Sequence, residues 1–240
     1  MIDSYSLGGG TPNSDSDVLS LMGQSKSKNL YSGDSSADVK SSHLPSICQG
    51  GLLDIATEGN SLACCSEDKS ICIFDWRECV HDYSAMKRTY FNGHMKVVNA
   101  VSLRNQKLYS VSRDLSICIW DVPSGSLSSS IANAHELNIV DIQLNQDASR
   151  FVTGSRDYSV KVWDAELGKT IKEYSFPRNV VTCLAYGMDN ALIYQGSEDL
   201  NVRVYDIRSS SKMPVKQLSE YVYFPISIDV RNDGHHLVTG

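Results

Sequence analysis

Apolar and polar residues alternate with a period of two in many short runs along the chain. In the run Ser159-Val-Lys-Val-Trp163, for example, this alternation predicts a β-strand that is buried on one face. Clusters of serine, asparagine, aspartate, glycine and proline separate the runs and are typical of turns. The pattern therefore predicts an all-β protein built from many short strands.

The expected strands fall into four groups of four, followed by the first two strands of a fifth group. Their ranges are 52–56, 61–66, 70–75, 87–91, 97–103, 107–112, 116–121, 126–132, 139–144, 150–155, 159–164, 170–175, 180–186, 192–196, 201–206, 215–219, 224–230 and 236–240. A loop at 77–86 lengthens the first group. We therefore expect four complete structural units and the beginning of a fifth.

A ten-residue stretch recurs once in each of the four groups. The copies read SEDKSICIFD at 66–75, SRDLSICIWD at 112–121, SRDYSVKVWD at 155–164 and SEDLNVRVYD at 197–206. Each copy has a serine, an aspartate two places later, and an aromatic residue followed by a second aspartate. The first aspartates of the copies, Asp68, Asp114, Asp157 and Asp199, are 46, 43 and 42 residues apart. A period in the low forties that ends in an aromatic residue and an aspartate indicates a β-propeller blade.

These stretches resemble the WD40 repeat family, and the resemblance covers residues 43–240. It implies a WD40 β-propeller with four complete blades and the start of a fifth. Val238-Thr-Gly240 aligns with Val152-Thr-Gly154, so the sequence stops within a blade. We therefore expect an incomplete propeller, a fragment of a seven-blade ring, because a complete ring joins its first and last blades and leaves no exposed strand edge.

Residues 1–42 differ in composition from the rest of the chain. They are rich in serine, glycine, aspartate and lysine and contain only isolated apolar residues. Such a segment cannot bury enough apolar surface to offset the entropy cost of ordering it. The sequence therefore predicts a disordered tail at 1–42 and a propeller domain at 43–240.

Charge and hydropathy exclude several kinds of partner. The net charge of −6 at pH 7 gives no basic field to attract nucleic acid or an anionic membrane surface. No apolar run approaches the roughly 20 residues that a membrane-spanning helix needs. The first residues, MIDSYSLGGG, lack the basic and apolar regions of a secretory signal. These features favour a cytoplasmic protein.

The sequence contains seven cysteines, and none of them forms a C-x-x-C pair. Cys64, Cys72, Cys118 and Cys183 fall within expected strands. Buried, reduced thiols are therefore a better interpretation than a disulfide framework or a metal site. We expect the protein to need neither a metal nor another cofactor.

The WD40 resemblance also implies a hydrogen-bonded tetrad within a blade, made of a histidine, a strand serine or threonine, the turn aspartate and a tryptophan indole. In blade two the expected members are His94, Ser112, Asp114 and Trp120, with Ser110 as the alternative hydroxyl. In blade three they are His135, Ser155, Asp157 and Trp163, with Thr153 as the alternative hydroxyl.

A histidine, a serine and an aspartate together also occur in hydrolase triads. Here the set appears twice at one period, beside a tryptophan and without a nucleophile elbow, which favours a structural role and no catalysis. Phe74 and Tyr205 replace the tryptophan in blades one and four, and blade four also lacks the histidine. We therefore expect the turns of blades one and four to be less firmly fixed.

The resemblance implies that the residue before each turn aspartate projects from one face of the propeller. These residues are Glu67, Arg113, Arg156 and Glu198. Residues at the start of the inner strands would border the same surface, namely Lys96, Asn138 and Arg178. Two arginines flanked by two acids favour an acidic or phosphorylated segment of a partner protein as the ligand. The alternative is that these charges are simply solvated.

Two narrower resemblances bear on function. Phe74-Asp-Trp-Arg77 and Tyr205-Asp-Ile-Arg208 resemble the WDxR box of propellers that act as substrate receptors of cullin-type ubiquitin ligases, although both copies lack its first tryptophan. Arg178-Asn-Val-Val-Thr-Cys183, with Ser197-Glu-Asp, Tyr205-Asp and the Asp-Gly-His at 233–235, is similar to the WD repeat-containing protein thirty-one group. The second resemblance implies a non-enzymatic scaffold in ciliary assembly or trafficking.

The sequence thus predicts a protein-interaction scaffold that binds other proteins and has no catalytic activity and no small-molecule substrate. A substrate receptor of a cullin-type ubiquitin ligase is the alternative.

Overall fold

The structure is a computed structural model that describes residues 50–75, 88–187, 189–219, 221–231 and 236–240. These residues all belong to one compact unit, His43–Gly240. The expected disordered tail at 1–42 and the expected loop at 77–86 lie outside the described residues.

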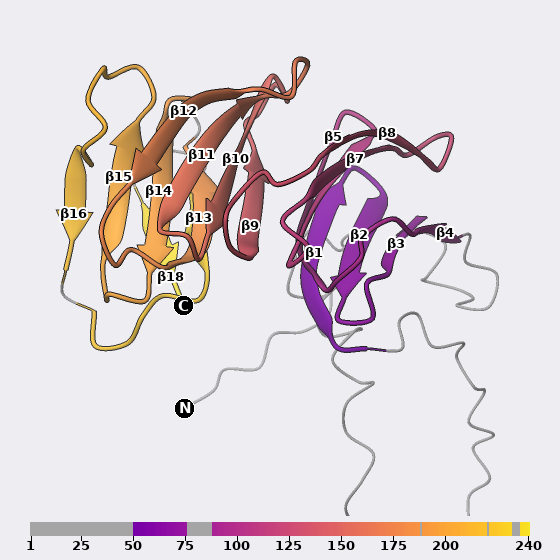
Figure 1. Cartoon of the computed structure of the whole chain (residues 1–240), viewed down its shortest axis with the longest axis horizontal. Helices are drawn as coiled ribbons and strands as arrows, with labels where there is room; N and C mark the ends of the chain where they lie inside the picture. Colours follow the sequence, from indigo (N-terminus) through magenta and orange to yellow (C-terminus); the bar gives the residue numbers. More distant parts are fainter. Residues whose placement is uncertain (1–49, 76–87, 188, 220, 232–235) are drawn as a thin grey trace, which may run out of the picture. The chain divides into compact units, whose positions relative to one another are not determined.

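Four antiparallel four-stranded sheets follow one another along the chain, each with its strands in sequence order (Figure 1). Blade one contains β1 (Leu52–Glu58), β2 (Ser61–Ser66), β3 (Ile71–Asp75) and β4 (Arg88–Phe91). Blade two contains β5 (Val98–Arg104), β6 (Lys107–Ser112), β7 (Ile117–Asp121) and β8 (Ser126–Ile131). Blade three contains β9 (Ile139–Leu144), β10 (Arg150–Ser155), β11 (Ser159–Asp164) and β12 (Thr170–Ser175). Blade four contains β13 (Val181–Tyr186), β14 (Leu192–Ser197), β15 (Val202–Asp206) and β16 (Lys216–Leu218).

A fifth sheet has two strands, β17 (Ile228–Val230) and β18 (Leu237–Thr239). The first strands of successive sheets lie side by side, because β1 contacts β5, β5 contacts β9, β9 contacts β13 and β13 contacts β17. This is the arrangement of a β-propeller. The predicted fold class, with four complete blades and the start of a fifth, is therefore confirmed.

Strand β17 begins at Ile228, four residues later than predicted. Pro225 interrupts the predicted strand, since proline has no N–H to donate to a neighbouring strand. Its carbonyl instead accepts a hydrogen bond of 2.6 Å from the hydroxyl of Thr182 on β13. This segment therefore crosses from blade four to blade five without entering either sheet.

The apolar core lies in the seams between consecutive blades. In each seam an aromatic side chain from the third strand of the later blade packs against the earlier blade. These side chains are Trp120, Trp163 and Tyr205, each 4% exposed or less. Trp163 stacks on Phe151 with ring centroids 5.9 Å apart. Burial of rings of this size contributes a large share of the stability of a seam.

The five described cysteines, Cys64, Cys65, Cys72, Cys118 and Cys183, are all buried, and none of them takes part in a disulfide. Burial raises the pKa of Cys118 and of Cys183 to about 11. These thiols are therefore protonated near neutral pH and behave as small apolar side chains.

No helix among the described residues has the length and apolar character needed to cross a membrane. Within the same residues, no three histidine, cysteine, aspartate or glutamate side chains lie close enough together to hold a metal ion.

Candidate functional site

The four turns between the second and third strands share one backbone design. Each turn is tied to the start of its own blade by a backbone hydrogen bond of 3.0 Å, with the residue before the turn aspartate as donor. The donors are Glu67, Arg113, Arg156 and Glu198, and the acceptors are Gly51, Val97, Asn138 and Val180. All four donor residues have exposed side chains. The structure therefore gives these residues equivalent positions on four consecutive blades.

The residue after each turn aspartate has a left-handed backbone conformation. Its φ is 75° at Lys69, 71° at Leu115, 72° at Tyr158 and 65° at Leu200. None of these residues is glycine, and a bulky residue in this region costs roughly 1 kcal/mol or more. The contacts of the turn aspartate must therefore compensate for this backbone strain.

In blade two a chain of hydrogen bonds runs from the core to the turn. The indole N–H of Trp120 donates to Ser110 Oγ at 2.9 Å, and Ser110 Oγ lies 2.8 Å from Nε2 of His94. Nδ1 of His94 lies 3.2 Å from a carboxylate oxygen of Asp114. The indole can only donate, so the hydroxyl must donate to Nε2 and Nδ1–H must donate to the carboxylate.

Blade three repeats this chain with a threonine as the hydroxyl. Trp163 Nε1–H donates to Thr153 Oγ1 at 2.8 Å, which lies 2.8 Å from Nε2 of His135. Nδ1 of His135 lies 2.9 Å from Asp157. In each blade the network connects the turn aspartate to the indole in the seam. A substitution at the turn should therefore also affect the packing of the core.

The prediction that Ser112 and Ser155 belong to the tetrads is wrong. Both hydroxyls accept a hydrogen bond of 3.1 Å from the backbone N–H of the turn aspartate and donate to a backbone carbonyl at the start of the blade. They lie at the end of the strand, beside the turn. The residues two places earlier, Ser110 and Thr153, lie between the imidazole and the indole and therefore take the relay position.

The electrostatics of the two networks follow from their burial. Burial lowers the pKa of His94, and the nearby carboxylate of Asp114 offsets only part of this effect. Burial alone would raise the pKa of Asp157, but hydrogen bonds from His135 and Ser159 outweigh it and hold the pKa well below its usual range. At neutral pH the imidazole of His94 is therefore neutral, and Asp157 is ionised.

Blade four has a different network, which the sequence analysis missed. The side-chain amides of Asn179 and Gln195 exchange two hydrogen bonds, of 3.0 and 2.7 Å, and both residues are fully buried. The hydroxyl of Tyr205 donates to Gln195 at 3.4 Å. Asn179, Gln195 and Tyr205 thus stand in for the histidine, the hydroxyl and the tryptophan.

Arg203 completes the network of blade four, with only 1% of the residue exposed. Its guanidinium binds both carboxylate oxygens of Asp199 and donates to Asn179 Oδ1 at 2.7 Å. It also lies over the ring of Phe176, 4.5 Å from the ring centroid. An ion pair thus takes the place of the missing histidine, whereas the expectation that the turn of blade four is less firmly fixed stays a prediction. Arg203 stands where two other repeats have a cysteine and one has a lysine, and this difference was the available sequence signal.

A depression of about 520 Å³ lies where the first strands of the blades meet. Of the predicted binding residues, Arg113, Arg156 and Asn138 line it. Glu67, Lys96 and Arg178 are exposed but do not line it. The structure thus brings the two arginines to one cavity and leaves the other predicted residues outside it.

Both arginines of the depression have a partner within the chain. Arg113 Nε donates to the side-chain oxygen of Asn99 at 3.1 Å. Arg156 Nη2 lies 3.0 Å from Glu198 Oε1, a pair that joins blades three and four. Glu198 is therefore a direct partner of Arg156, and not a separate flanking charge as its position in the sequence indicated.

Two carboxylates on inner strands join neighbouring blades, and nothing in the sequence analysis identified them. Asp54 accepts a hydrogen bond of 2.9 Å from the N–H of Val101, which links blades one and two. Asp141 accepts one of 2.6 Å from the N–H of Leu184, which links blades three and four. Burial, together with the charge of Asp54, raises the pKa of Asp141 to about 7. Both carboxylates line the depression.

Because the pKa of Asp141 is raised, the free energy of unfolding should depend on pH in a known direction. Between about pH 4 and pH 7 the folded chain holds a proton that the unfolded chain releases, so this group stabilises the fold less as the pH rises. Replacing Asp141 with asparagine removes the effect. The substitution should therefore cost roughly 2 kcal/mol more at pH 5 than at pH 8 in urea unfolding. Equal costs at the two pH values would contradict the assignment.

Four segments of the chain match the family profile described as "WD domain, G-beta repeat", at residues 47–75, 85–121, 126–164 and 168–206. The chain is 23% identical over 178 residues to apoptotic protease-activating factor 1 of Rattus norvegicus, covering 74% of this chain and 13% of that protein. It is 26% identical over 158 residues to nuclear distribution protein nudF of Aspergillus niger, covering 64% of this chain and 34% of that protein. It is 24% identical over 170 residues to a guanine nucleotide-binding protein subunit beta of Oryza sativa, covering 67% of this chain and 45% of that protein. The chain spans less than half of the length of each of these relatives.

Proposed function

The chain belongs to the WD40 repeat family, and on this premise we propose that it is a non-catalytic scaffold that captures an acidic or phosphorylated segment of a partner protein. Proteins with WD40 repeats are typically interaction scaffolds. Arg113 and Arg156 carry the proposal, because they occupy equivalent turns on neighbouring blades and line the same depression.

The chemistry of the two arginines suits an anionic ligand. A guanidinium can bind a carboxylate or a phosphate through two parallel hydrogen bonds, which a lysine cannot reproduce. The tetrads below both turns hold the backbone in place, so little conformational entropy is lost on binding. Asn99 and Asn138 line the same depression and offer further polar groups.

The ion pair between Arg156 and Glu198 does not prevent such binding. Its side chains are 52% and 39% exposed, and exposed pairs contribute about 0–1 kcal/mol. A phosphate group carries up to about two negative charges and three acceptor oxygens, so it can compete with one carboxylate. A ligand that displaces Glu198 from Arg156 would still find both arginines in the depression.

Reversal of both charges tests the proposal. Arg113→Glu with Arg156→Glu should reduce capture of partners from cell extract by about tenfold or more, because repulsion replaces two charge-assisted contacts. Co-precipitation with mass spectrometry measures capture, and circular dichroism on the same preparations measures folding.

Lys107→Glu with Lys169→Glu is the matched control. These exposed residues lie on the same two blades at the opposite ends of the strands, so the net change of charge is identical. Partner capture should remain as in the unmodified chain. Equal recovery of partners with the Arg113 and Arg156 double variant would place the interaction elsewhere.

We further propose a cytoplasmic location and a role in ciliary assembly or trafficking. The similarity of residues 178–183, 197–199 and 205–206 to the WD repeat-containing protein thirty-one group supports this setting; the stretch 233–235 lies outside the described residues. Imaging of the tagged chain in ciliated cells tests it, and exclusion of the chain from the ciliary base and shaft would contradict it.

The alternative, a substrate receptor of a cullin-type ubiquitin ligase, gains no support from Arg208. Its guanidinium lies 2.8 Å from Asp206 and 3.7 Å from Asp189, so it already has partners in blade four. Trp76 and Arg77 of the other copy lie outside the described residues. Enrichment of a cullin adaptor in the same co-precipitation would favour this alternative over the scaffold.

A further inference from the structure

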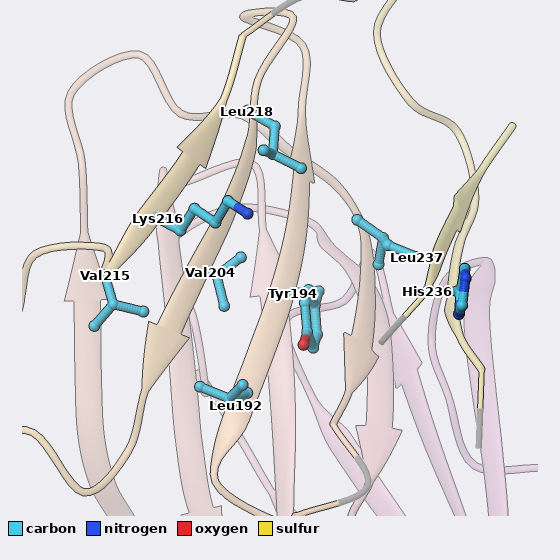
Figure 2. A pocket seen from close by; sticks show the side chains of 8 residues that line it. All are labelled: Leu192, Tyr194, Val204, Val215, Lys216, Leu218, His236 and Leu237. Carbon is cyan, nitrogen blue, oxygen red and sulfur yellow. The ribbon is translucent and has the colours of Figure 1, made fainter. Parts of the chain in front are cut away.

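A groove of about 300 Å³ lies between β14, β15 and β16 of blade four and β18 of blade five (Figure 2). Apolar side chains line most of it, and Figure 2 shows Tyr194 and Val204 on one side and Leu237 on the other. Blade five is present only in part, because the sequence stops within it. The groove therefore supports no assignment of a ligand.

The segment between β4 and β5 contains the only Asn-Gly dipeptide of the sequence, Asn92-Gly93. Both residues are exposed and belong to no strand. An asparagine in this context is chemically labile, because the backbone nitrogen of the next residue can attack its side-chain amide carbon. A following glycine has no Cβ to hinder that approach. The dipeptide is therefore a candidate site of deamidation.

In the connections that lead into blades three and four, a hydrogen bond engages the equivalent backbone nitrogen. The N–H of Ala134 donates to Leu115 O at 2.9 Å, and the N–H of Phe176 donates to Tyr158 O at 3.3 Å. Each acceptor is the residue that follows the turn aspartate of the preceding blade. Within the part of the chain that the structure describes, no backbone carbonyl accepts a hydrogen bond from the N–H of Gly93. This nitrogen is therefore available for the attack.

The residues on either side of the dipeptide pack against one indole. Phe91, which is 1% exposed, meets Trp120 edge to face with ring centroids 5.4 Å apart. The ring centroid of His94 lies 6.4 Å from that of the same indole. A Cβ at Gly93 would come within 2.7 Å of Trp120. The main chain from Phe91 to His94 therefore has little room for an additional atom.

We propose that Asn92 is a site of spontaneous deamidation and isoaspartate formation, which weakens the seam between blades one and two. The nitrogen of Gly93 loses its proton to hydroxide and attacks Cγ of Asn92, and the side-chain nitrogen leaves as ammonia. Water then opens the resulting succinimide at either carbonyl, which gives aspartate or isoaspartate. Isoaspartate adds one methylene group to the main chain, so Phe91 or His94 must move away from Trp120.

Incubation of the folded chain in mildly alkaline buffer tests the reaction. Peptide mapping by mass spectrometry measures deamidation, and labelling with an isoaspartate methyltransferase measures isoaspartate. Asn133 is the matched site, because it is also exposed and has the same place relative to the tetrad histidine of blade three. Modification should be about tenfold faster or more at Asn92 than at Asn133.

Ala134→Gly separates the effect of the dipeptide from that of the free nitrogen. It gives blade three the same dipeptide but keeps the N–H that donates to Leu115. In the folded variant Asn133 should still react about tenfold more slowly than Asn92, whereas in urea the two sites should react alike. Equal rates in the folded variant would overturn the role of the free nitrogen. Reaction at Asn92 in urea but not in the folded chain would overturn the proposal.

Urea unfolding followed by tryptophan fluorescence tests the consequence for the seam. The incubated chain should unfold at a lower urea concentration than the fresh chain. Incubated Asn92→Gln should show no such shift, because glutamine forms a cyclic imide far more slowly. Fresh Asn92→Asp adds the charge without lengthening the main chain, and at this exposed position it should leave the midpoint nearly unchanged.

Two results of the unfolding experiment would contradict the proposed effect on the seam. If incubated Asn92→Gln shifts as far as the incubated unmodified chain, the loss of stability arises at another residue. If fresh Asn92→Asp shifts as far, the new charge and not the longer main chain weakens the seam.

Discussion

Replacing Arg203 with methionine should lower the free energy of unfolding by roughly 3 kcal/mol, because it removes a buried guanidinium from its ion pair with Asp199, whose side chain is 24% exposed. The guanidinium binds both oxygens of Asp199 and donates to Asn179. Methionine keeps most of the length of the side chain but offers no donor. The carboxylate of Asp199 would then lose its charge partner, and the buried Asn179 would lose one of its donors. Urea unfolding followed by tryptophan fluorescence measures the change.

Arg208→Met is the matched control for this experiment. Arg208 also pairs with aspartates of blade four, but 67% of its side chain is exposed. Solvent screens exposed ion pairs, so this substitution should have a small effect. Asp199→Asn combined with Arg203→Met should recover part of the lost stability, because the unpaired charge is then absent. Equal losses for Arg203→Met and Arg208→Met would show that the buried network does not fix the turn.

The strands of this fold were predictable because each has a local signal. Alternation of apolar and polar residues, the repeated turn and the spacing of the turn aspartates predicted every strand in its correct place. Only the start of β17 was misplaced, four residues too early, because the predicted strand 224–230 included Pro225. There the chain crosses between blades, and Pro225 serves as an acceptor instead of a strand residue.

The side-chain networks were less predictable because they depend on distances across the fold. Ser110 and Ser112 are chemically identical and lie on the same side of one strand, so only the position of the imidazole and the indole separates their roles. The bonds from Asp54 to Val101 and from Asp141 to Leu184 span more than forty residues. No local pattern marks such a pair.

The candidate site was predictable in position but not in its internal contacts. The repeat spacing placed Arg113 and Arg156 on neighbouring turns, and both do line one depression. The pairing of Arg156 with Glu198 was missed, because it depends on how far two long side chains reach from one blade to the next. Turn positions follow from backbone repeats, whereas partners of exposed side chains do not.

Asp157→Ala should lower the free energy of unfolding by about 3 kcal/mol, because several donors lose their acceptor at once. Asp157 accepts hydrogen bonds of 2.9 Å from His135 Nδ1 and from the N–H of Glu136, and one of 3.0 Å from the N–H of Ser159. His135 is 2% exposed, so water cannot readily replace the carboxylate. Ser159 Oγ, 3.0 Å from His135 Nδ1, can take over one of these bonds, which sets an upper limit on the loss.

Asp68→Ala, the equivalent change in blade one, should cost only about 1 kcal/mol. Asp68 accepts hydrogen bonds from the N–H of Ser70 at 2.8 Å and from that of Gly50 at 3.3 Å, but Phe74 has no N–H to connect the turn with the seam. The pKa of Asp157 is lowered on folding, so its contribution is fully present above about pH 4 and lost as the pH falls through the folded pKa. In urea unfolding, the difference in stability loss between Asp157→Ala and Asp68→Ala should therefore be largest near neutral pH and become smaller in acid. If Asp68→Ala proves as costly as Asp157→Ala at pH 7, the connection from turn to indole contributes nothing to the stability of its blade.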